Sequence, residues 1–321
     1  MKLFRKLAVF ALCGVFALAI AGCQSQKQEA PERDTDLQVS DAPAAETFTG
    51  PFWVLVVGND SRIGTTQIDN PNYSDGTGRS DTIMLMRIDP KTYNVGIITV
   101  ARDTATEYNG QTVKLNETYR QGGIAELSKQ VQKLTGATPK YTFDMDFVQF
   151  EKFVDGLGGV TANVPINMQL KDIVAGDKIS LSAGERNLNG AEALVLARSR
   201  KQYANDLDAC RQIQDRQIVQ RAIEQVAADP ANAAAHVNTL VGNCDTDWPL
   251  DSLVALVADF AQNADKITFT SGTGPYDGNQ DTGLWLATRD EATWAQVIDT
   301  VEAGGDPTTI VPLPQVVALE G

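Results

Sequence analysis

Short apolar runs of strand length alternate with segments of helical spacing from residue 52 onward, and this alternation restricts the architectures open to the chain. The run 52–57 (FWVLVV) ends at a glycine, and two further strands are expected at 82–88 and 95–100. Residues 123–135 have the apolar spacing of a helix and stop at Gly136. Because strands and helices alternate without a repeat, the pattern predicts one α/β/α sandwich with a mixed central sheet.

The same alternation continues toward the C-terminus. Further strands are expected around 141–143, over 160–164 and around 267–270, and further helices over 147–157, 190–197, 208–228, 249–262 and 291–303. Residues 63–77 form a long polar loop beside the first strand. Loops of that length in a compact domain are often functional, so this one is a candidate for a functional role.

The first 23 residues have the three parts of an export signal. Three basic residues within 2–6 precede an uncharged apolar run at 7–19, and two small residues then precede Cys23. A cysteine directly after the small pair predicts a lipoprotein signal, with residues 1–22 removed and a diacylglycerol attached to the thiol of Cys23. An ordinary signal peptide and a retained membrane helix are the alternatives, although the run is short for a span of roughly 20 residues.

A polar segment separates this signal from the first strand. Residues 23–50 lack any apolar period, which predicts a disordered tether between the lipid and a folded domain, residues 51–321. A diacylated cysteine anchors a protein more firmly than a single acyl chain does. We therefore expect an extracytoplasmic domain that is held by its lipid on the outer face of the cytoplasmic membrane.

The charge balance and the histidine count exclude several classes of function. The chain has 27 Lys and Arg against 41 Asp and Glu, a net charge of −14, and offers no basic field for nucleic acid. His236 is the single histidine, so Ser-His-Asp and Cys-His mechanisms are disfavoured, and its alanine-rich polar surroundings predict a surface or capping position. Walker and G-x-G-x-x-G motifs are absent. Acidic and arginine side chains remain as the candidates for chemistry.

Two cysteines remain once the signal and the lipidated residue are set aside. Cys210 and Cys244 are an even pair in a domain expected to be exported, and a disulfide between them is the favoured interpretation. Two buried thiols are the alternative. A zinc site is disfavoured, because two cysteines and one histidine do not make a zinc ligand set.

Polar clusters stand at the ends of the first two expected strands. Asp60 and Arg62 follow the first strand in GNDSR, and Arg79 and Asp81 precede the second in GRSDT. Adjacent strands can bring the two aspartates to one edge of a sheet, where a divalent cation needs carboxylate oxygens. The two arginines beside them are suited to phosphate, which a guanidinium fork binds in a bidentate manner.

Two more clusters follow. Arg102 lies at the end of the third strand, where ligands of open α/β sheets bind, and Lys114 lies in a loop beyond it. Arg198 and Arg200 are alternate residues and share a face if that stretch is extended. Each cluster alone is most often a turn or a surface ion pair. Four of them at the ends of elements, in an acidic chain, favour a site for a metal ion and a pyrophosphate.

Several of these segments together resemble the LytR-CpsA-Psr family of cell-envelope glycopolymer transferases. The resemblance extends from about residue 52 to 226 and includes VLVVGNDSR, GRSDTIMLMRIDP, ITVARDT, KLNETYRQGG, FVDGLGGVTANVP, LNGAEALVLARSR and RQIVQRAI. It implies an α/β/α fold with a hydrophobic channel for a polyprenyl tail. It also implies Mg²⁺-dependent transfer of a glycopolymer from a polyprenyl-pyrophosphate donor to a hydroxyl acceptor, usually on peptidoglycan.

The resemblance also assigns roles to residues. Asp60 and Asp81 correspond to the metal carboxylates, and we hypothesise that Asp81 or a neighbouring carboxylate orients or deprotonates the acceptor. The arginine nearest the pyrophosphate corresponds to Arg102. The remaining contacts to the pyrophosphate correspond to Arg62, Arg79, Lys114, Arg198 and Arg200, together with Arg211 and Gln217.

The sequence departs from the family pattern after Arg200. The spacing of Arg211 from the pair Arg216-Gln217 is altered by what resembles an inserted residue, so either arginine can face the site. Two other functions remain open for the same residues: a pyrophosphatase that hydrolyses polyprenyl-linked diphosphates, and a non-catalytic lipoprotein that binds polyprenyl-linked glycans. A role in transcription is disfavoured, because the chain is acidic and has no helix-turn-helix signal.

Overall fold

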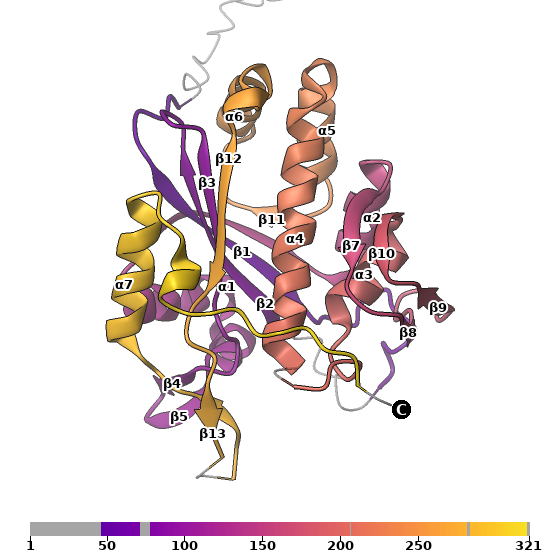
Figure 1. The fold of residues 1–321 in the computed structure, drawn as a ribbon, viewed down its shortest axis with the longest axis vertical. Helices are drawn as coiled ribbons and strands as arrows, with labels where there is room; N and C mark the ends of the chain where they lie inside the picture. Colours follow the sequence, from indigo (N-terminus) through magenta and orange to yellow (C-terminus); the bar gives the residue numbers. More distant parts are fainter. Residues whose placement is uncertain (1–45, 71–77, 206, 281–282, 320–321) are drawn as a thin grey trace, which may run out of the picture. The chain divides into compact units, whose positions relative to one another are not determined.

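A mixed sheet of six strands forms the centre of the domain (Figure 1). The computed structural model describes residues 46–70, 78–205, 207–280 and 283–319. Its strands, in spatial order, are β11 (Asp245–Thr246), β6 (Pro139–Met145), β1 (Phe52–Asn59), β2 (Ser80–Asp89), β3 (Asn94–Thr99) and β12 (Thr268–Thr273). β1, β2 and β3 are antiparallel neighbours, whereas β6 runs parallel to β1 and β12 parallel to β3. The predicted mixed sheet is therefore confirmed.

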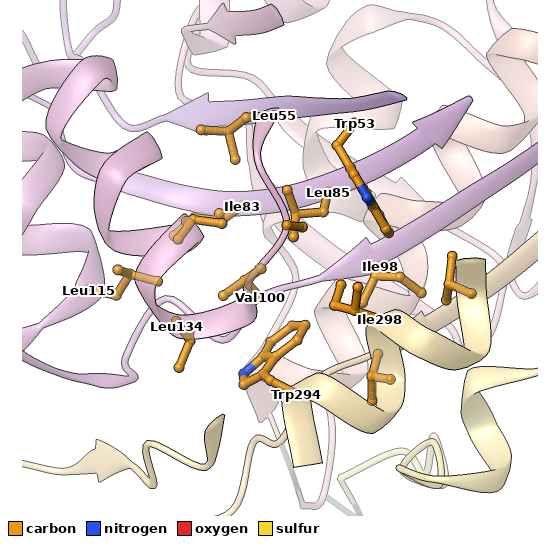
Figure 2. Close-up of a cluster of buried hydrophobic side chains, with 14 of the residues drawn as sticks. Trp53, Leu55, Ile83, Leu85, Ile98, Val100, Leu115, Leu134, Trp294 and Ile298 are labelled. Atoms are coloured by element: carbon orange, nitrogen blue, oxygen red, sulfur yellow. The ribbon is translucent and has the colours of Figure 1, made fainter. Parts of the chain in front are cut away.

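Helices pack on both faces of this sheet. They are α1 (Leu115–Thr135), α2 (Phe147–Gly156), α3 (Gly190–Arg198), α4 (Leu207–Ala227), α5 (Ala233–Val241), α6 (Leu250–Gln262) and α7 (Glu291–Glu302). On one face, Leu55 and Leu85 of the sheet pack against Leu134 of α1 and against Trp294 and Ile298 of α7, as Figure 2 shows. α1 and α7 therefore form one outer layer.

The opposite face of the same strands packs against α5 and α6. Successive side chains of a strand point to opposite faces, so Val54 and Met86 turn away from α1 and α7. They belong to a second buried cluster with Val237 of α5 and with Leu256 and Phe260 of α6. Two helical layers thus enclose the sheet, and the predicted α/β/α sandwich is confirmed.

Four two-stranded ribbons lie outside the central sheet. They pair β4 (Ala105–Tyr108) with β5 (Gln111–Lys114), β7 (Val160–Val164) with β10 (Gly184–Leu188), β8 (Met168–Lys171) with β9 (Lys178–Leu181), and β13 (Gly278–Asn279) with β14 (Leu286–Ala287). Three short 3-10 helices complete the described elements: η2 (Pro230–Asn232), η3 (Ala264–Lys266) and η4 (Pro307–Thr309). Of the ribbon strands, only 160–164 was expected.

Helix α1 begins earlier than its spacing predicted. The segment after Lys114 was expected to be a loop, but Leu115 and Asn116 are buried in the first turn of the helix. Gly123 interrupts the helix with a φ of 68°. This conformation is open to glycine because it has no Cβ. The expected helix over 123–135 is the second half of α1, and Gly136 ends it in the left-handed conformation.

The folded domain begins a few residues before the predicted boundary at residue 51. Glu46 accepts hydrogen bonds from Lys140 and Tyr141, and the ring of Phe48 stacks on Phe52 with centroids 4.5 Å apart. The end of the predicted tether is thus part of the packed domain. The signal peptide, the lipidated Cys23 and most of the tether lie outside the described residues, as does part of the loop 63–77. Within the described ranges, no helix has the length and hydropathy of a membrane span.

The predicted disulfide between Cys210 and Cys244 is wrong for this structure. Both residues are buried, but on different elements. The thiol of Cys210, in α4, donates to the carbonyl oxygen of Asn205 at 3.5 Å, whereas Cys244 packs in the second core cluster after α5. The thiol of Cys210 also lies 3.7 Å from the carbonyl oxygen of Gln315, so the two thiols have different neighbours.

Candidate active site: an arginine-lined mouth on an apolar cavity

Three predicted site residues meet at one edge of the central sheet. Antiparallel pairing of β1 and β2 puts Asn59 opposite Ser80, so Asp60 and Asp81 lie beside each other although 20 residues of chain separate them. β3 runs antiparallel to β2 and ends at the same edge, which brings Arg102 to Asp81 with 2.5 Å between Nη1 and Oδ1. The prediction that Asp60 and Asp81 reach one edge of the sheet is confirmed, and the structure adds Arg102 to them.

Asp60 is buried beside a second negative charge. Its Oδ1 accepts a hydrogen bond from the backbone N–H of Arg79 at 2.7 Å, and its Oδ2 lies 3.4 Å from Nη2 of Arg62. Burial raises the pKa of Asp60, and the neighbouring charge of Asp81 raises that pKa further. Gly78 allows this tight turn, because a Cβ there would lie 2.6 Å from the backbone nitrogen of Ser61.

Arg102 connects carboxylates from three parts of the chain. Besides Asp81, its Nε lies 3.3 Å from Asp208 of α4 and 3.8 Å from Asp103. Burial alone would lower the pKa of Arg102, but these three carboxylates raise it on balance. The guanidinium is therefore held charged and in a fixed position at the edge of the sheet.

Arg211, and not Arg216, faces this site. Its guanidinium pairs with Asp208 at 3.2 Å and with Asp215, and Nη2 donates to the backbone oxygen of Asp81 at 2.7 Å. Asp215 also accepts from the hydroxyl of Thr82 at 2.8 Å. Burial raises the pKa of Asp215 to about 6, against the opposing effect of Arg211. The structure thus settles the choice that the altered spacing left open.

The sequence analysis missed Asp208, Asp215 and Thr82. A signal for the first two was present, because Asp208, Arg211 and Asp215 are spaced by three and four residues and so share one face of a helix. Thr82 adjoins Asp81 in the strand, and only the strand pairing shows which neighbours the hydroxyl reaches.

Two further predicted arginines share an aromatic platform. The guanidinium carbons of Arg62 and Arg198 lie 5.1 and 5.0 Å from the ring centroid of Phe147, the first residue of α2. Such cation–π contacts fix the plane of each guanidinium against the aromatic ring. Arg198 is the last residue of α3, so the expected extended stretch starts only at Ser199. Arg200 lies beyond it, with Nη1 3.5 Å from Asp208.

These charged residues form the mouth of one large cavity. The cavity has a volume of about 540 Å³, and the mouth residues that line it are Asp60, Arg62, Asp81, Thr82, Arg102, Arg198, Arg200, Arg211 and Asp215. The rest of its wall is mainly apolar and comes from the face of the sheet (Val56, Met84, Met86, Ile88) and from α2, α4, α5 and α6 (Phe150, Ile218, Val219, Ala222, Val226, Leu240, Leu256, Val257, Phe260). His236 of α5 also lines it and is partly buried, with Nε2 3.2 Å from Asp229. A charged mouth and an apolar interior are therefore continuous.

Three of the predicted phosphate ligands point elsewhere. The side chain of Arg79 is half-exposed and its Nε lies 3.2 Å from Glu117, while Lys114 pairs with Asp103 at 2.8 Å. Gln217 holds the backbone of Asn163 in β7. None of the three lines the cavity. Their predicted contacts to pyrophosphate therefore have no support from this geometry.

The carboxylates at the mouth suit a divalent cation. A cation between Asp60 and Asp81 would offset both the burial and the mutual repulsion that raise the pKa of Asp60. Among the described residues no three acidic, cysteine or histidine side chains gather as a metal site, and Asp60 and Asp81 are the two carboxylates that would hold a cation here. Mg²⁺ is commonly bound in that way.

The fold and the site agree with the family that the sequence identifies. The sequence profile of the LytR_cpsA_psr family matches residues 14–302, so the chain belongs to that family.

Known relatives agree with this assignment. The polyisoprenyl-teichoic acid–peptidoglycan teichoic acid transferase TagU of Bacillus licheniformis is 27% identical over 251 residues, which cover 77% of this chain and 76% of the relative. The regulatory protein MsrR of Staphylococcus aureus is 33% identical over 168 residues, 52% of this chain and 49% of its own length. The crystal structure of Bacillus subtilis TagV has a TM-score of 0.64 at 23% identity and covers 84% of this chain and all of that one, which supports the fold.

Proposed function

We propose that the protein is a Mg²⁺-dependent phosphotransferase that moves a glycopolymer from a polyprenyl-pyrophosphate carrier to a hydroxyl acceptor on peptidoglycan or another envelope component. The observation that carries the proposal is the continuity between the arginine-lined mouth and the apolar cavity of about 540 Å³. A diphosphate head matches the mouth, and a polyprenyl tail matches the interior. TagU, which the chain resembles over three quarters of its length, is named as a polyisoprenyl-teichoic acid–peptidoglycan teichoic acid transferase, and this name supports the proposal.

The location follows from the same proposal. A lipid on Cys23 would hold the domain on the outer face of the cytoplasmic membrane, where polyprenyl-linked donors are embedded and peptidoglycan is within reach. The mouth would then receive the diphosphate head at the membrane surface while the tail passes from the bilayer into the cavity.

The arginines of the mouth bind the diphosphate. Arg62 and Arg198 line the cavity from the ring of Phe147, and Arg102 and Arg211 line it from the sheet edge and α4. An acceptor oxygen forms a bond to the phosphorus that carries the sugar, and the bond from this phosphorus to the bridging oxygen breaks, so polyprenyl phosphate leaves. Phosphoryl transfer of this kind depends mostly on positioning and on offsetting charge as it redistributes.

The acceptor proton needs a base at the same place. Asp81 is the more accessible of the two aspartates, and Arg102 donates a hydrogen bond to its Oδ1 and not to its Oδ2. We assign to it the orientation of the acceptor hydroxyl and the receipt of its proton. Asp60 and Asp81 would hold Mg²⁺, which would supply further stabilisation of negative charge on the diphosphate.

A transfer assay tests the proposal. The full chain in lipid nanodiscs is incubated with Mg²⁺ and a short-chain polyprenyl-pyrophosphate sugar, with and without peptidoglycan oligomers, and released polyprenyl phosphate and sugar-modified oligomers are measured. We expect release that requires metal and acceptor and that is lost in Asp81→Ala. Arg289→Ala is the control, because Arg289 lies outside the cavity and pairs with Glu291.

Other outcomes identify the alternatives. Release without acceptor, with inorganic or sugar phosphate as the product, would assign a pyrophosphatase. Tight binding of the donor without release under any of these conditions would assign a binding lipoprotein. Either outcome contradicts the transferase.

A further inference from the structure

Helix α4 separates two hollows. Residues 211, 215, 218, 219 and 222 recur at spacings of three and four and line the large cavity. Residues 213, 216, 217, 220 and 221 line a second hollow of about 280 Å³, which is closed on another side by Ser271 of β12 and by Leu313. No described residue lines both, so the second hollow is distinct from the candidate active site.

A buried arginine stands in the wall of this second hollow. Arg216 is 2% exposed, and it donates to the hydroxyls of Ser271 at 3.1 Å and Thr99 at 2.5 Å. Both partners are neutral, and no carboxylate of the described residues lies within ion-pair distance of its guanidinium. The neighbouring Asp215 turns to the other side of α4 and pairs there with Arg211 and Thr82.

An isolated buried cation is costly. A charge taken out of water needs a partner of opposite sign or a change in its ionisation. Burial accordingly lowers the pKa of Arg216 to about 10, and the only opposing influence is the charge of Asp215. Hydroxyl dipoles compensate a guanidinium less than a carboxylate or phosphate does.

A second cation stands at the rim. Arg221 lies five residues further along α4 and is 42% exposed, with Glu224 and Glu185 as its partners at 2.8 and 3.9 Å. The amides of Gln217 and Gln220 are also in the wall. Those amides donate to Asn163 and Glu224, so the two guanidinium groups are what offers an anion positive charge at this hollow.

We propose that this hollow, between α4, β12 and the segment at Leu313, is a second oxyanion site that binds a phosphate or carboxylate group through Arg216 and Arg221. The oxyanion replaces the missing charged partner of Arg216, and Arg221 contacts it from the rim. A phosphodiester of a glycopolymer and a carboxylate of a peptide stem share this chemistry. The site is independent of the transfer reaction and persists if that assignment fails.

Side-chain NMR gives a direct test. The full chain in nanodiscs is labelled with ¹⁵N-arginine, and the Nε–Hε resonances are followed as inorganic phosphate is added. The resonance of Arg216 is identified by its loss in Arg216→Lys. We expect the Arg216 and Arg221 resonances to shift with one common midpoint, and we expect Arg221→Gln to raise that midpoint roughly tenfold. Arg186→Gln, a change at an exposed arginine of β10, should leave the midpoint unchanged.

The probes distinguish the sources of the anion. A glycerol phosphodiester that shifts Arg216 at lower concentration than an N-acetylglutamyl peptide would point to the glycopolymer, and the reverse would point to a peptide stem. If none of the three probes (inorganic phosphate, the phosphodiester and the peptide) shifts the Arg216 and Arg221 resonances, the role of Arg216 is only to hydrogen-bond α4 to the sheet. The proposal would then be wrong. A shift that is the same in wild type and Arg221→Gln would also overturn it.

Discussion

A phenylalanine in place of Ala222 tests whether the apolar cavity holds the tail of the substrate. Ala222 is buried, lies on α4 and lines the cavity next to Ile218 and Val219. Ala222 packs beside Ile218 in a buried cluster and also lines the cavity, so the larger side chain is expected to extend into the hollow, and thermal stability reports any overpacking. Its ring adds six carbon atoms and displaces a comparable part of any apolar chain inside.

The size of the effect follows from the displaced contacts. Burial of a CH₂-sized group contributes about 0.8 kcal/mol, so loss of three to five such groups lowers donor binding by about 2–4 kcal/mol. This corresponds to a dissociation constant that is roughly thirty- to thousand-fold higher. Inorganic pyrophosphate, which has no tail, should bind wild type and Ala222→Phe equally.

Calorimetric titration with farnesyl pyrophosphate and with inorganic pyrophosphate measures both effects. Ala228→Phe is the matched control, since Ala228 is exposed just beyond the end of the same helix. Equal affinity of wild type and Ala222→Phe for the farnesyl compound, with thermal stability unchanged, would refute the assignment of the cavity to the tail.

Three further perturbations have defined outcomes. Arg102→Ala should lower the turnover number on the order of 10²–10³-fold, as for loss of one oxyanion donor, and Arg102→Lys should recover only part of it because an ammonium lacks the fork, both measured by release of polyprenyl phosphate. Burial and then the carboxylate of Asp172 raise the pKa of Glu151 to about 8, so its protonated form stabilises the fold at low pH and this contribution is lost as pH rises toward 8. Glu151→Gln should therefore raise the melting temperature more at pH 8 than at pH 5, and an equal change at both pH values would contradict that account. Trp294→Ala should cost about 3–5 kcal/mol in urea unfolding, because Trp294 is fully buried between α7 and the sheet, and a loss below 1 kcal/mol would show that this face repacks.

The central elements were predictable because their signals are local. The apolar run of β1 and the helices α1 and α2 can be recognised from the spacing of apolar residues and from the glycines that follow them. The meeting of Asp60, Asp81 and Arg102 was predictable in turn, since it follows from strand ends once the strands are antiparallel neighbours.

Other features depend on contacts between distant segments. The ribbon strands β8 and β9 have four residues each, half of them apolar, which is too few to distinguish a strand from a loop by pattern. The direction of Arg211 is set by its partners Thr82 and Asp81 across more than 125 residues. The disulfide prediction failed for the same reason, because cysteine parity carries no information about the separation of Cys210 and Cys244 in space.

Binding of a series of prenyl pyrophosphates tests the central claim most directly. The affinity of the full chain for inorganic, geranyl, farnesyl and geranylgeranyl pyrophosphate is measured by calorimetry in nanodiscs with Mg²⁺. A continuous site predicts that affinity increases by at least roughly tenfold with each five-carbon unit until the cavity is full, since each unit buries several CH₂-sized groups. It also predicts that Arg102→Ala weakens every member of the series by a similar factor. Affinity that does not depend on tail length would contradict the claim that the charged mouth and the apolar cavity form one site.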